Sequence, residues 1–528
     1  MSGIERQGVA SSADPPPRVR WRPAIGLRVA ILMIGVALAA ILSLPGQTVT
    51  TKYVNDLFIF LDGAHRIWSG QVPNVDFHSS LGPLAFYLAA AGYGISGTVS
   101  GAMPAGMALI VILLAVLASE IIASRMRQLI GLPLALFLLL IAAVPVNPGE
   151  WIGELSFAMF YNRIGWAALG LLLVMYLPRR SEEPQRPALD ALCAAILSLL
   201  MLYTKITYGL MAMAFLAFML TDRRQRVWSA MALASTAVST MLIEIVWHGS
   251  LSHLNDLRLA GMVSGDLPTF RVMADVVLTN LADIAVFGIV AALLLHLRRR
   301  VRDFLFVGFC LASGLLIIEQ NFQIVGILTL GAAAAVIAEQ LLSSQTATRG
   351  NSWEQGLPLL LGVLILPPTV SHAISLTMHA GYATSGKGEQ MALPRFEGIR
   401  LIPMWSEGQY EAFRRYNASI ADGAAALERL GTPAERLAVL DFVNPFSAGL
   451  NLEPPAGDSP WYHWGRTLDR DHFPDPADIF ADVEIIMEPK SPIEIYTGRG
   501  MREVYADYLD QHFSEVIETA QWKIYRRR

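Results

Sequence analysis

The sequence predicts a mainly α-helical polytopic membrane protein that ends in a smaller α/β domain. Of its 528 residues, 54% are hydrophobic and only 16% are charged, which is too apolar for a soluble globular chain. Apolar runs long enough to cross a hydrocarbon core of about 30 Å recur from Ala24 to Leu376 and then stop. The remainder, 377–528, has the mixed composition of a soluble domain.

The apolar runs predict about eleven transmembrane helices within 24–376. They lie at 24–44, 102–123, 128–145, 164–177, 188–204, 207–221, 228–247, 274–296, 303–319, 323–342 and 355–376. The segment before them, 1–23, is rich in Ser, Pro and Arg and is expected to be a disordered cytosolic leader.

Arginine residues predict the orientation of the helices. Three precede the first span, and further clusters fall in every second loop, at 125–127, 179–180, 223–226 and 298–302. Because such residues favour the cytoplasmic side, the N-terminus and these loops are expected there. The large loop 45–101 and the tail 377–528 then lie on the opposite side, the periplasm if the membrane is a bacterial inner membrane.

The sequence also excludes several classes of site. The two cysteines, Cys193 and Cys310, lie in separate predicted spans, so neither a disulfide framework nor a cysteine metal site is expected. A divalent metal is compatible with the chain, but no ligand set in the sequence indicates one, and no other cofactor is predicted. The net charge of −4 and the lack of a basic, aromatic stripe give no indication of a nucleic-acid partner.

The loop 45–101 carries the most distinctive pattern. Apolar residues recur at helical spacing over 57–68, which predicts an amphipathic helix lying on the membrane, with Asp62 and Arg66 as a surface ion pair. Gly70 and the proline that follows it end this helix, and an extended stretch carrying Asp76 comes next.

The residues of this loop resemble the GT-C superfamily of membrane glycosyltransferases. The resemblance rests on Asn55-Asp56-Leu57 opening the helix, on Gly70-x-x-Pro73-x-x-Asp76-Phe77, and on Gly82-Pro83-Leu84 before the second span. It extends to the plan of about eleven spans followed by a periplasmic C-terminal domain. Family members carry an Asp-Asp or Asp-Glu pair in this loop, whereas here Asp56 has no acidic neighbour.

The resemblance implies transfer of a sugar from a polyprenyl-phosphate donor to a periplasmic glycan, lipid or protein, with inversion at the anomeric carbon. An acceptor hydroxyl needs a carboxylate to take its proton, and Asp56 is the candidate base. Asp76 is the second acidic candidate, able to bind sugar hydroxyls or orient the acceptor, and which of the two is the principal base stays open. Alternatively, Asn55 or Asp56 caps a helix that starts at Leu57.

Two basic residues are candidates for binding the donor phosphate. Lys205 interrupts the apolar run between the fifth and sixth spans on the periplasmic side, where related GT-C enzymes often carry a lysine. Snorkelling of an ordinary lysine is the alternative. Arg163 opens the fourth span from the same side, and its alternative role is an ion pair with Glu150 or Glu154.

Further candidates for contacts with the acceptor, or for the lining of a cavity, lie near the seventh span and in the tail. They are Glu244, Arg258, Arg271, Trp461 and Trp464. In the tail, helices are expected over 412–430 and 502–512, and strands over 436–442, 483–487 and 522–525.

Two other functions compete with a glycosyltransferase. A secondary transporter or lipid flippase fits the apolar composition, but no internal repeat is seen, and a large extracytoplasmic tail is unusual for a carrier. An inactive GT-C-like assembly subunit fits the missing acidic neighbour of Asp56. The sugar and the acceptor are not specified by the sequence.

Overall fold

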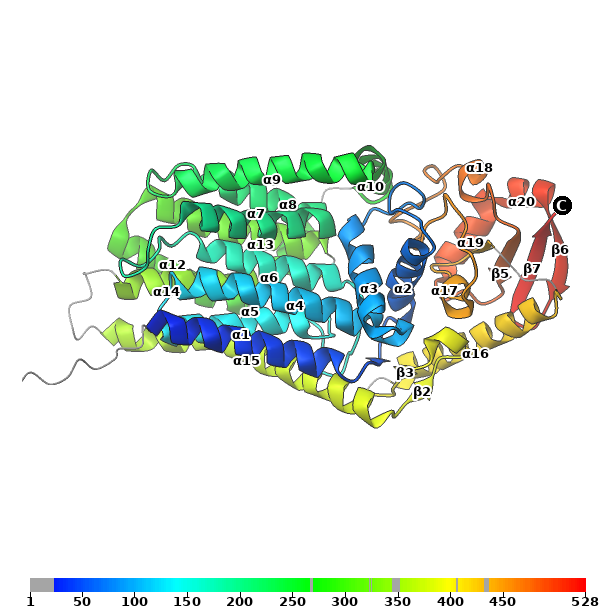
Figure 1. Cartoon of the computed structure of the whole chain (residues 1–528), viewed down its shortest axis with the longest axis horizontal. Helices are drawn as coiled ribbons and strands as arrows, with labels where there is room; N and C mark the ends of the chain where they lie inside the picture. The colour runs from blue at the N-terminus through cyan, green and yellow to red at the C-terminus, as the bar shows by residue number, and fades with distance from the viewer. Residues whose placement is uncertain are drawn as a thin grey trace, which may run out of the picture.

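A computed structural model of the chain describes residues 23–265, 269–321, 323, 325–343, 352–404, 407–431 and 436–528. It shows a bundle of long helices with a smaller α/β unit packed on one end (Figure 1). The predicted cytosolic leader lies outside the described residues, except for Pro23, which begins the first helix.

Seven helices in the described part of the chain are long and apolar enough to cross a membrane. They are α1 (Pro23–Ser43), α4 (Val99–Ala123), α7 (Pro187–Thr204), α9 (Arg226–Trp247), α12 (Leu281–Arg298), α13 (Val301–Gln320) and α15 (Ser352–Ser385). Four shorter apolar helices pack among them: α5 (Gln128–Ala143), α6 (Phe160–Val174), α8 (Ile206–Met219) and α14 (Thr329–Ser343). The prediction of a mainly helical chain is confirmed, and the length and composition of these helices are compatible with a multi-pass membrane protein.

The predicted span at 274–296 is interrupted. A short helix, α11 (Phe270–Thr279), ends at Asn280, and α12 begins at the next residue. The Asn280 side chain accounts for the break, because its amide donates to the Val276 carbonyl (2.8 Å) and its oxygen accepts from the Gly326 amide (2.8 Å). The loop after α9 also forms a helix, α10 (Ser250–Ser264), which the apolar pattern did not predict.

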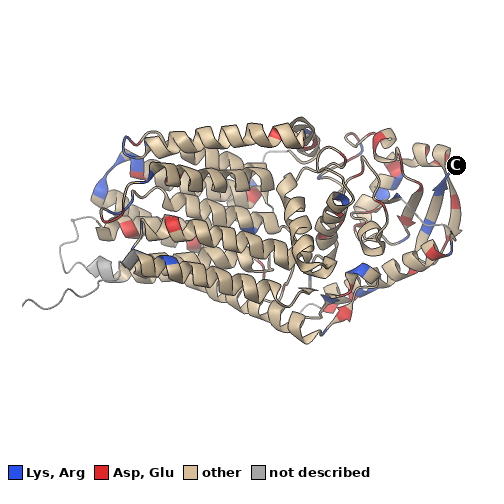
Figure 2. Cartoon of the chain, viewed as in Figure 1, with Lys and Arg blue, Asp and Glu red and all other residues tan. Residues whose placement is uncertain are grey.

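Lysine and arginine residues gather at the end of the helix bundle that lies farthest from the α/β unit (Figure 2). Some of them are buried in ion pairs there. Arg179 binds Glu120 and Asp190 (both 2.8 Å), and Arg125 binds the same Asp190 (2.8 Å). Basic residues are therefore concentrated at the end of the bundle opposite the α/β unit.

The loop between α1 and α4 folds into β1 (Thr48–Thr50), α2 (Val54–Trp68) and α3 (Pro83–Ser96). The prediction that this helix lies on the membrane surface is wrong, because α2 lies between α3 and the tail and buries most of its residues (Figure 1). Arg66 and Asp62, expected to form a surface pair, are both fully buried at 2.7 Å from one another. The tail covers the polar face of α2 that the sequence pattern assigned to solvent.

The tail forms the small α/β unit that was predicted. Its four-stranded sheet has the order β4 (Leu437–Val439), β5 (Ile485–Pro489), β7 (Trp522–Arg527), β6 (Phe513–Glu518). The first pair is parallel and the other two pairs are antiparallel. Around the sheet lie α16 (Glu407–Glu428), α17 (Phe446–Leu450), α18 (Pro476–Ile479), α19 (Ile495–Val504) and α20 (Ala506–His512).

A second sheet joins the tail to the first loop. β1 pairs in parallel with β3 (Ile399–Leu401), which also pairs with β2 (Glu389–Gln390). A short 3-10 helix, η1 (Pro394–Phe396), connects these two tail strands. Residues about 350 positions apart thus share backbone hydrogen bonds, so the first loop and the tail form one structural unit above the helix bundle.

Candidate functional site

Polar side chains from four segments come together where the helix bundle meets the α/β unit. We call this group the junction cluster, and it consists of Asp56, Tyr161, Lys205 and Arg466. Asp56 comes from α2, Tyr161 from the start of α6, Lys205 from the turn between α7 and α8, and Arg466 from a loop of the tail. The cluster unites one carboxylate with two cations.

The Asp56 side chain does not stabilise the start of its helix. Helix α2 begins at Val54, and the residue before it, Tyr53, has left-handed backbone angles (φ 56°, ψ 45°) without a side-chain cap. Asp56 therefore lies in the first turn and does not cap the helix, so that alternative is wrong. In the described part of the chain, no hydrogen bond or ion pair engages its carboxylate.

The surroundings of Asp56 favour its protonated form more than water does. Burial raises the pKa of this carboxyl to about 7, Arg466 opposes the shift, and Glu150 adds to it. A carboxylate that gains and loses a proton near neutral pH is suited to general-base chemistry, because both protonation states are populated under working conditions.

Glu150, which was an expected partner of Arg163, is held by Lys52 and Tyr53 instead. The Lys52 ammonium lies 3.0 Å from Glu150 and 3.2 Å from Glu154, and the Tyr53 hydroxyl donates to Glu150 at 3.1 Å. The expected ion pair of Arg163 with these glutamates is therefore wrong. The Lys52 network fixes Glu150 beside the junction cluster and keeps a negative charge near Asp56.

Lys205 contacts neutral groups only. Its ammonium donates to the Asn321 side-chain oxygen and lies 5.5 Å from the centroid of the Tyr161 ring. The Asn321 amide in turn donates to the Tyr208 hydroxyl at 2.9 Å. No carboxylate in the described residues lies within ion-pair range of Lys205, so a half-buried positive charge is left available for an anion.

Arg466 is the residue of the junction cluster that the sequence did not identify. It follows Gly465, whose φ of 74° permits a tight turn, and its guanidinium lies within electrostatic range of both Asp56 and Lys205. Such an arginine belongs to the cluster only because the tail folds back onto the bundle, more than 400 residues after Asp56. The aromatic and polar run around it was the one available signal.

Asp76 lies in a turn that the tail repeats. Its carboxylate accepts from the Val72 amide at 2.8 Å, and Asn74 in the same turn has a φ of 58°. In the second turn, the Thr467 hydroxyl accepts from the His463 amide at 2.8 Å, four positions earlier as in the first. The matching turns indicate that the Asp76 side chain closes its own loop, and no contact in the described part of the chain joins it to the junction cluster.

Arg163 is 1% exposed and lies away from the junction cluster. Its guanidinium donates to the backbone carbonyls of Val144, Val146 and Ser156. These contacts join the start of α6 to the segment that follows α5. Of the two basic candidates for the donor phosphate, the structure thus brings only Lys205 to the cluster.

The remaining sequence candidates are dispersed. Glu244 accepts from the amide and hydroxyl of Ser250 and so caps the start of α10, while Arg258 is exposed on the same helix. Trp461 lines a pocket between the tail and α10. Trp464 packs over Gly500 on another side of the tail, where an added Cβ would meet its ring at 2.1 Å.

Among the described residues, no group of three or more His, Cys, Asp or Glu side chains is arranged to hold a metal ion. The junction cluster itself offers a carboxyl group whose pKa is raised to about 7, a tyrosine hydroxyl and two cations. Neither a scan against protein-family models nor a search of curated proteins finds a match for this chain.

Proposed function

We propose that the chain is a membrane glycosyltransferase that moves a sugar from a polyprenyl-phosphate donor to a periplasmic glycan, lipid or protein. The observation that carries this proposal is the position of Asp56. Burial raises the pKa of its carboxyl to about 7, the side chain does not cap its helix, and Arg466 lies within electrostatic range of it. Lys205 joins the cluster through Arg466 and the Tyr161 ring. The resemblance of the first loop to GT-C enzymes supports the same reaction.

In the proposed reaction, an acceptor hydroxyl attacks the anomeric carbon of the donor sugar, and Asp56 takes the hydroxyl proton. The new bond forms as the bond between the anomeric carbon and the phosphate oxygen breaks. The polyprenyl phosphate leaves with the electron pair, and Lys205 and Arg466 stabilise its added negative charge. A single displacement of this kind inverts the configuration at the anomeric carbon.

The proposal includes an orientation of the protein in the membrane. We propose about eleven membrane crossings in a bacterial inner membrane, with the N-terminus cytoplasmic and the tail periplasmic. The arginine-rich end of the bundle lies opposite the tail, in agreement with the preference of positive residues for the cytoplasm (Figure 2). The junction cluster then lies where the headgroup of a lipid-linked donor would meet a periplasmic acceptor.

The test is turnover of donor by the full chain in lipid nanodiscs. A panel of polyprenyl-phosphate sugars, each labelled in the sugar, is offered together with periplasmic extract, and release of polyprenyl phosphate and transfer of label are measured. We expect one donor to be consumed by the wild type and not by Asp56→Asn. Asp471→Asn, which alters an exposed tail carboxylate, is the control.

Two results would contradict the proposal. One is undiminished turnover by Asp56→Asn, because an amide cannot accept the acceptor proton. The other is movement of an intact lipid-linked sugar across the bilayer without cleavage of its phosphate bond, which would support a transporter.

A further inference from the structure

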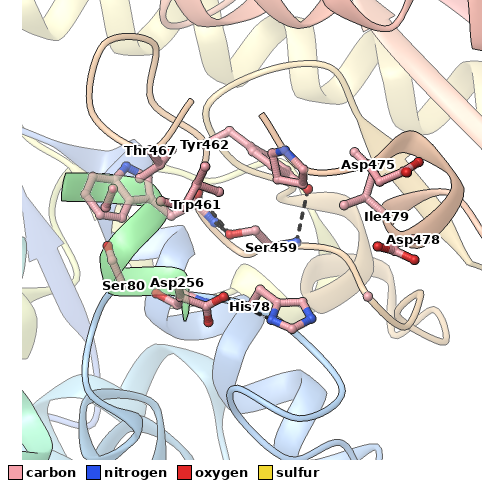
Figure 3. Close-up of a pocket in the computed structure, with 15 residues that line it drawn as sticks. His78, Ser80, Asp256, Ser459, Trp461, Tyr462, Thr467, Asp475, Asp478 and Ile479 are labelled. Carbon is pink, nitrogen blue, oxygen red and sulfur yellow. Dashed lines mark hydrogen bonds and ion pairs between the residues drawn. The ribbon is translucent and has the colours of Figure 1, made fainter. Parts of the chain in front are cut away.

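A pocket separate from the junction cluster opens between the helix bundle and the tail. Its volume is about 200 Å³, and it is open to solvent. His78, Ser80 and Asp256 lie on one side, and residues of the tail lie on the other (Figure 3). The pocket is therefore formed only when the first loop, α10 and the tail are packed together.

The tail side of the pocket combines an aromatic ring with hydroxyl groups. Trp461 is half-buried and packs edge-on against Phe442 and His463, with ring centroids 6.3 and 6.1 Å away. Its indole N–H is buried and has no hydrogen-bond partner among the described residues. The indole ring, which lines the pocket, suits a sugar, because the apolar face of a sugar packs on aromatic rings.

The charges of the pocket are acidic. Asp256, Asp475 and Asp478 line it, and none of its described lining residues is Lys or Arg. Asp256 is engaged by Asn74, Ser79 and His78, and Asp475 caps α18 through the Ala477 amide.

Asp478 differs from the other two carboxylates. It is exposed, and no side-chain hydrogen bond is found for it in the described part of the chain. It faces His78, whose pKa is raised first by the hydrogen bond to Asp256 and further by the charge of Asp478. Asp478 thus offers a carboxylate without a side-chain hydrogen bond in the described part of the chain, and it lies opposite the Trp461 end of the pocket (Figure 3).

The pocket and the junction cluster share one loop. Thr467 lines the pocket, and the residue before it, Arg466, reaches toward Asp56 and Lys205. A ligand in the pocket would therefore lie against the loop that supplies a cation to the cluster.

We propose that this pocket binds the acceptor, and that the acceptor is a saccharide carrying a protonated amine. The role of the bound saccharide as acceptor rests on the proposed function, whereas binding of the saccharide does not. Trp461 supplies the stacking surface, and Asp478 binds the ammonium group, since carboxylates with no neighbouring Lys or Arg favour cations and disfavour acidic sugars.

The test measures binding without donor, in the full-length chain and in the inactive Asp56→Asn variant. The probes are tetramers of glucosamine, N-acetylglucosamine and galacturonic acid, followed through tryptophan fluorescence. We expect the glucosamine tetramer to bind at least about tenfold more tightly than the N-acetylated one, and the galacturonate tetramer not to bind. Asp478→Asn should remove that preference, and Trp461→Ala should remove binding of both.

Two control variants test whether the loss of binding is specific to the pocket. Asp471→Asn and Tyr496→Ala alter an exposed carboxylate and an exposed ring that line a different pocket of the tail, and both should bind like the wild type. Equal binding of the galacturonate tetramer, no binding of any probe, or an unchanged preference in a folded Asp478→Asn variant would overturn the inference. A different result separates the two proposals. If Asp56→Asn binds the glucosamine tetramer but the wild type transfers no sugar, the proposed transfer is refuted and the proposed binding site is retained.

Discussion

Arg66 of α2 and Asp458 of the tail form an ion pair of 2.7 Å whose side chains are 0% and 5% exposed. The same guanidinium binds Asp62 on its own helix and donates to the Pro455 carbonyl at 2.7 Å. Asp458 also accepts from the Tyr462 hydroxyl at 2.8 Å, in the loop that leads to Arg466. One buried arginine therefore connects the helix that bears Asp56 with the loop that completes the junction cluster.

Asp458→Asn should weaken the packing of the tail on α2. The substitution leaves a buried arginine with one carboxylate in place of two, and breaking a buried ion pair typically costs about 3–5 kcal/mol. We expect a lower melting temperature and faster proteolysis of the tail in nanodiscs. Arg470→Gln is the control, because its pair with Glu503 is 72% and 56% exposed and should contribute less than about 1 kcal/mol. Equal stability of the two variants would contradict the buried connection.

Asp56→Asn should lose activity, and the wild-type rate should follow the titration of this residue. With a pKa of about 7, the base form of Asp56 accumulates as the pH rises through neutrality, so the transfer rate should rise to a plateau above pH 7. Removal of a general base typically lowers the rate by roughly 10²–10⁴-fold. A rate that is independent of pH between 5 and 9 would contradict the assignment.

The same substitution should stabilise the protein at high pH. An aspartic acid in an unfolded chain has a pKa of about 3.9, whereas burial raises that of Asp56 to about 7. Between these two values the folded protein retains a proton that the unfolded chain has lost, so wild-type stability falls as the pH rises. Asp56→Asn carries no such proton. Its melting temperature should therefore exceed that of the wild type at pH 8, and the difference should shrink as the pH falls toward 4. A destabilised variant at pH 8 would indicate a structural role.

Asp76→Thr should be tolerated, because the second turn places Thr467 at the equivalent position with the same hydrogen bond. We expect a melting temperature close to that of the wild type and normal transfer. Asp76→Ala removes the hydrogen bond and should cost about 1 kcal/mol. If Asp76→Thr is folded but inactive, the carboxylate itself is needed, and the role of base passes from Asp56 to Asp76.

The apolar helices and the small α/β tail could be predicted because each follows from a local pattern. Asp56 and Lys205 could also be selected, since each is a polar residue in an apolar or amphipathic context. The burial of Arg66 could not be predicted, because the sequence pattern of α2 shows a polar face but not the segment of the tail that covers it. Arg466 was missed for the same reason, as its role depends on contacts between residues hundreds of positions apart.

The orientation of the chain can be measured with an impermeant thiol reagent. The native cysteines Cys193 and Cys310 are both buried, so the wild type provides an unreactive background. Asp471→Cys in the tail and Ser181→Cys between α6 and α7 are both at exposed positions. We expect the reagent to label only the tail position in intact cells and both positions after the membrane is permeabilised. Labelling of Ser181→Cys alone in intact cells would reverse the proposed orientation.

Lys205→Gln and Arg466→Gln should each weaken use of the donor. Loss of one charge-assisted contact to a phosphate is expected to cost about 1.5–3 kcal/mol, which corresponds to a roughly 10–150-fold rise in the apparent KM for the donor. The KM for the acceptor should change little, because the pocket that includes Trp461 lacks both residues.

Arg258→Gln is the matched control, since this arginine is exposed on α10 and should leave the donor KM unchanged. A pair of folded Lys205→Gln and Arg466→Gln variants that use donor like the wild type would exclude the junction cluster as the phosphate site. A raised KM in Arg258→Gln would then move the site to the segment between α9 and α12, where Arg271 on α11 is another exposed cation to test. The comparison separates a phosphate contact from a general effect of positive charge, because all three substitutions remove one charge from the same end of the bundle.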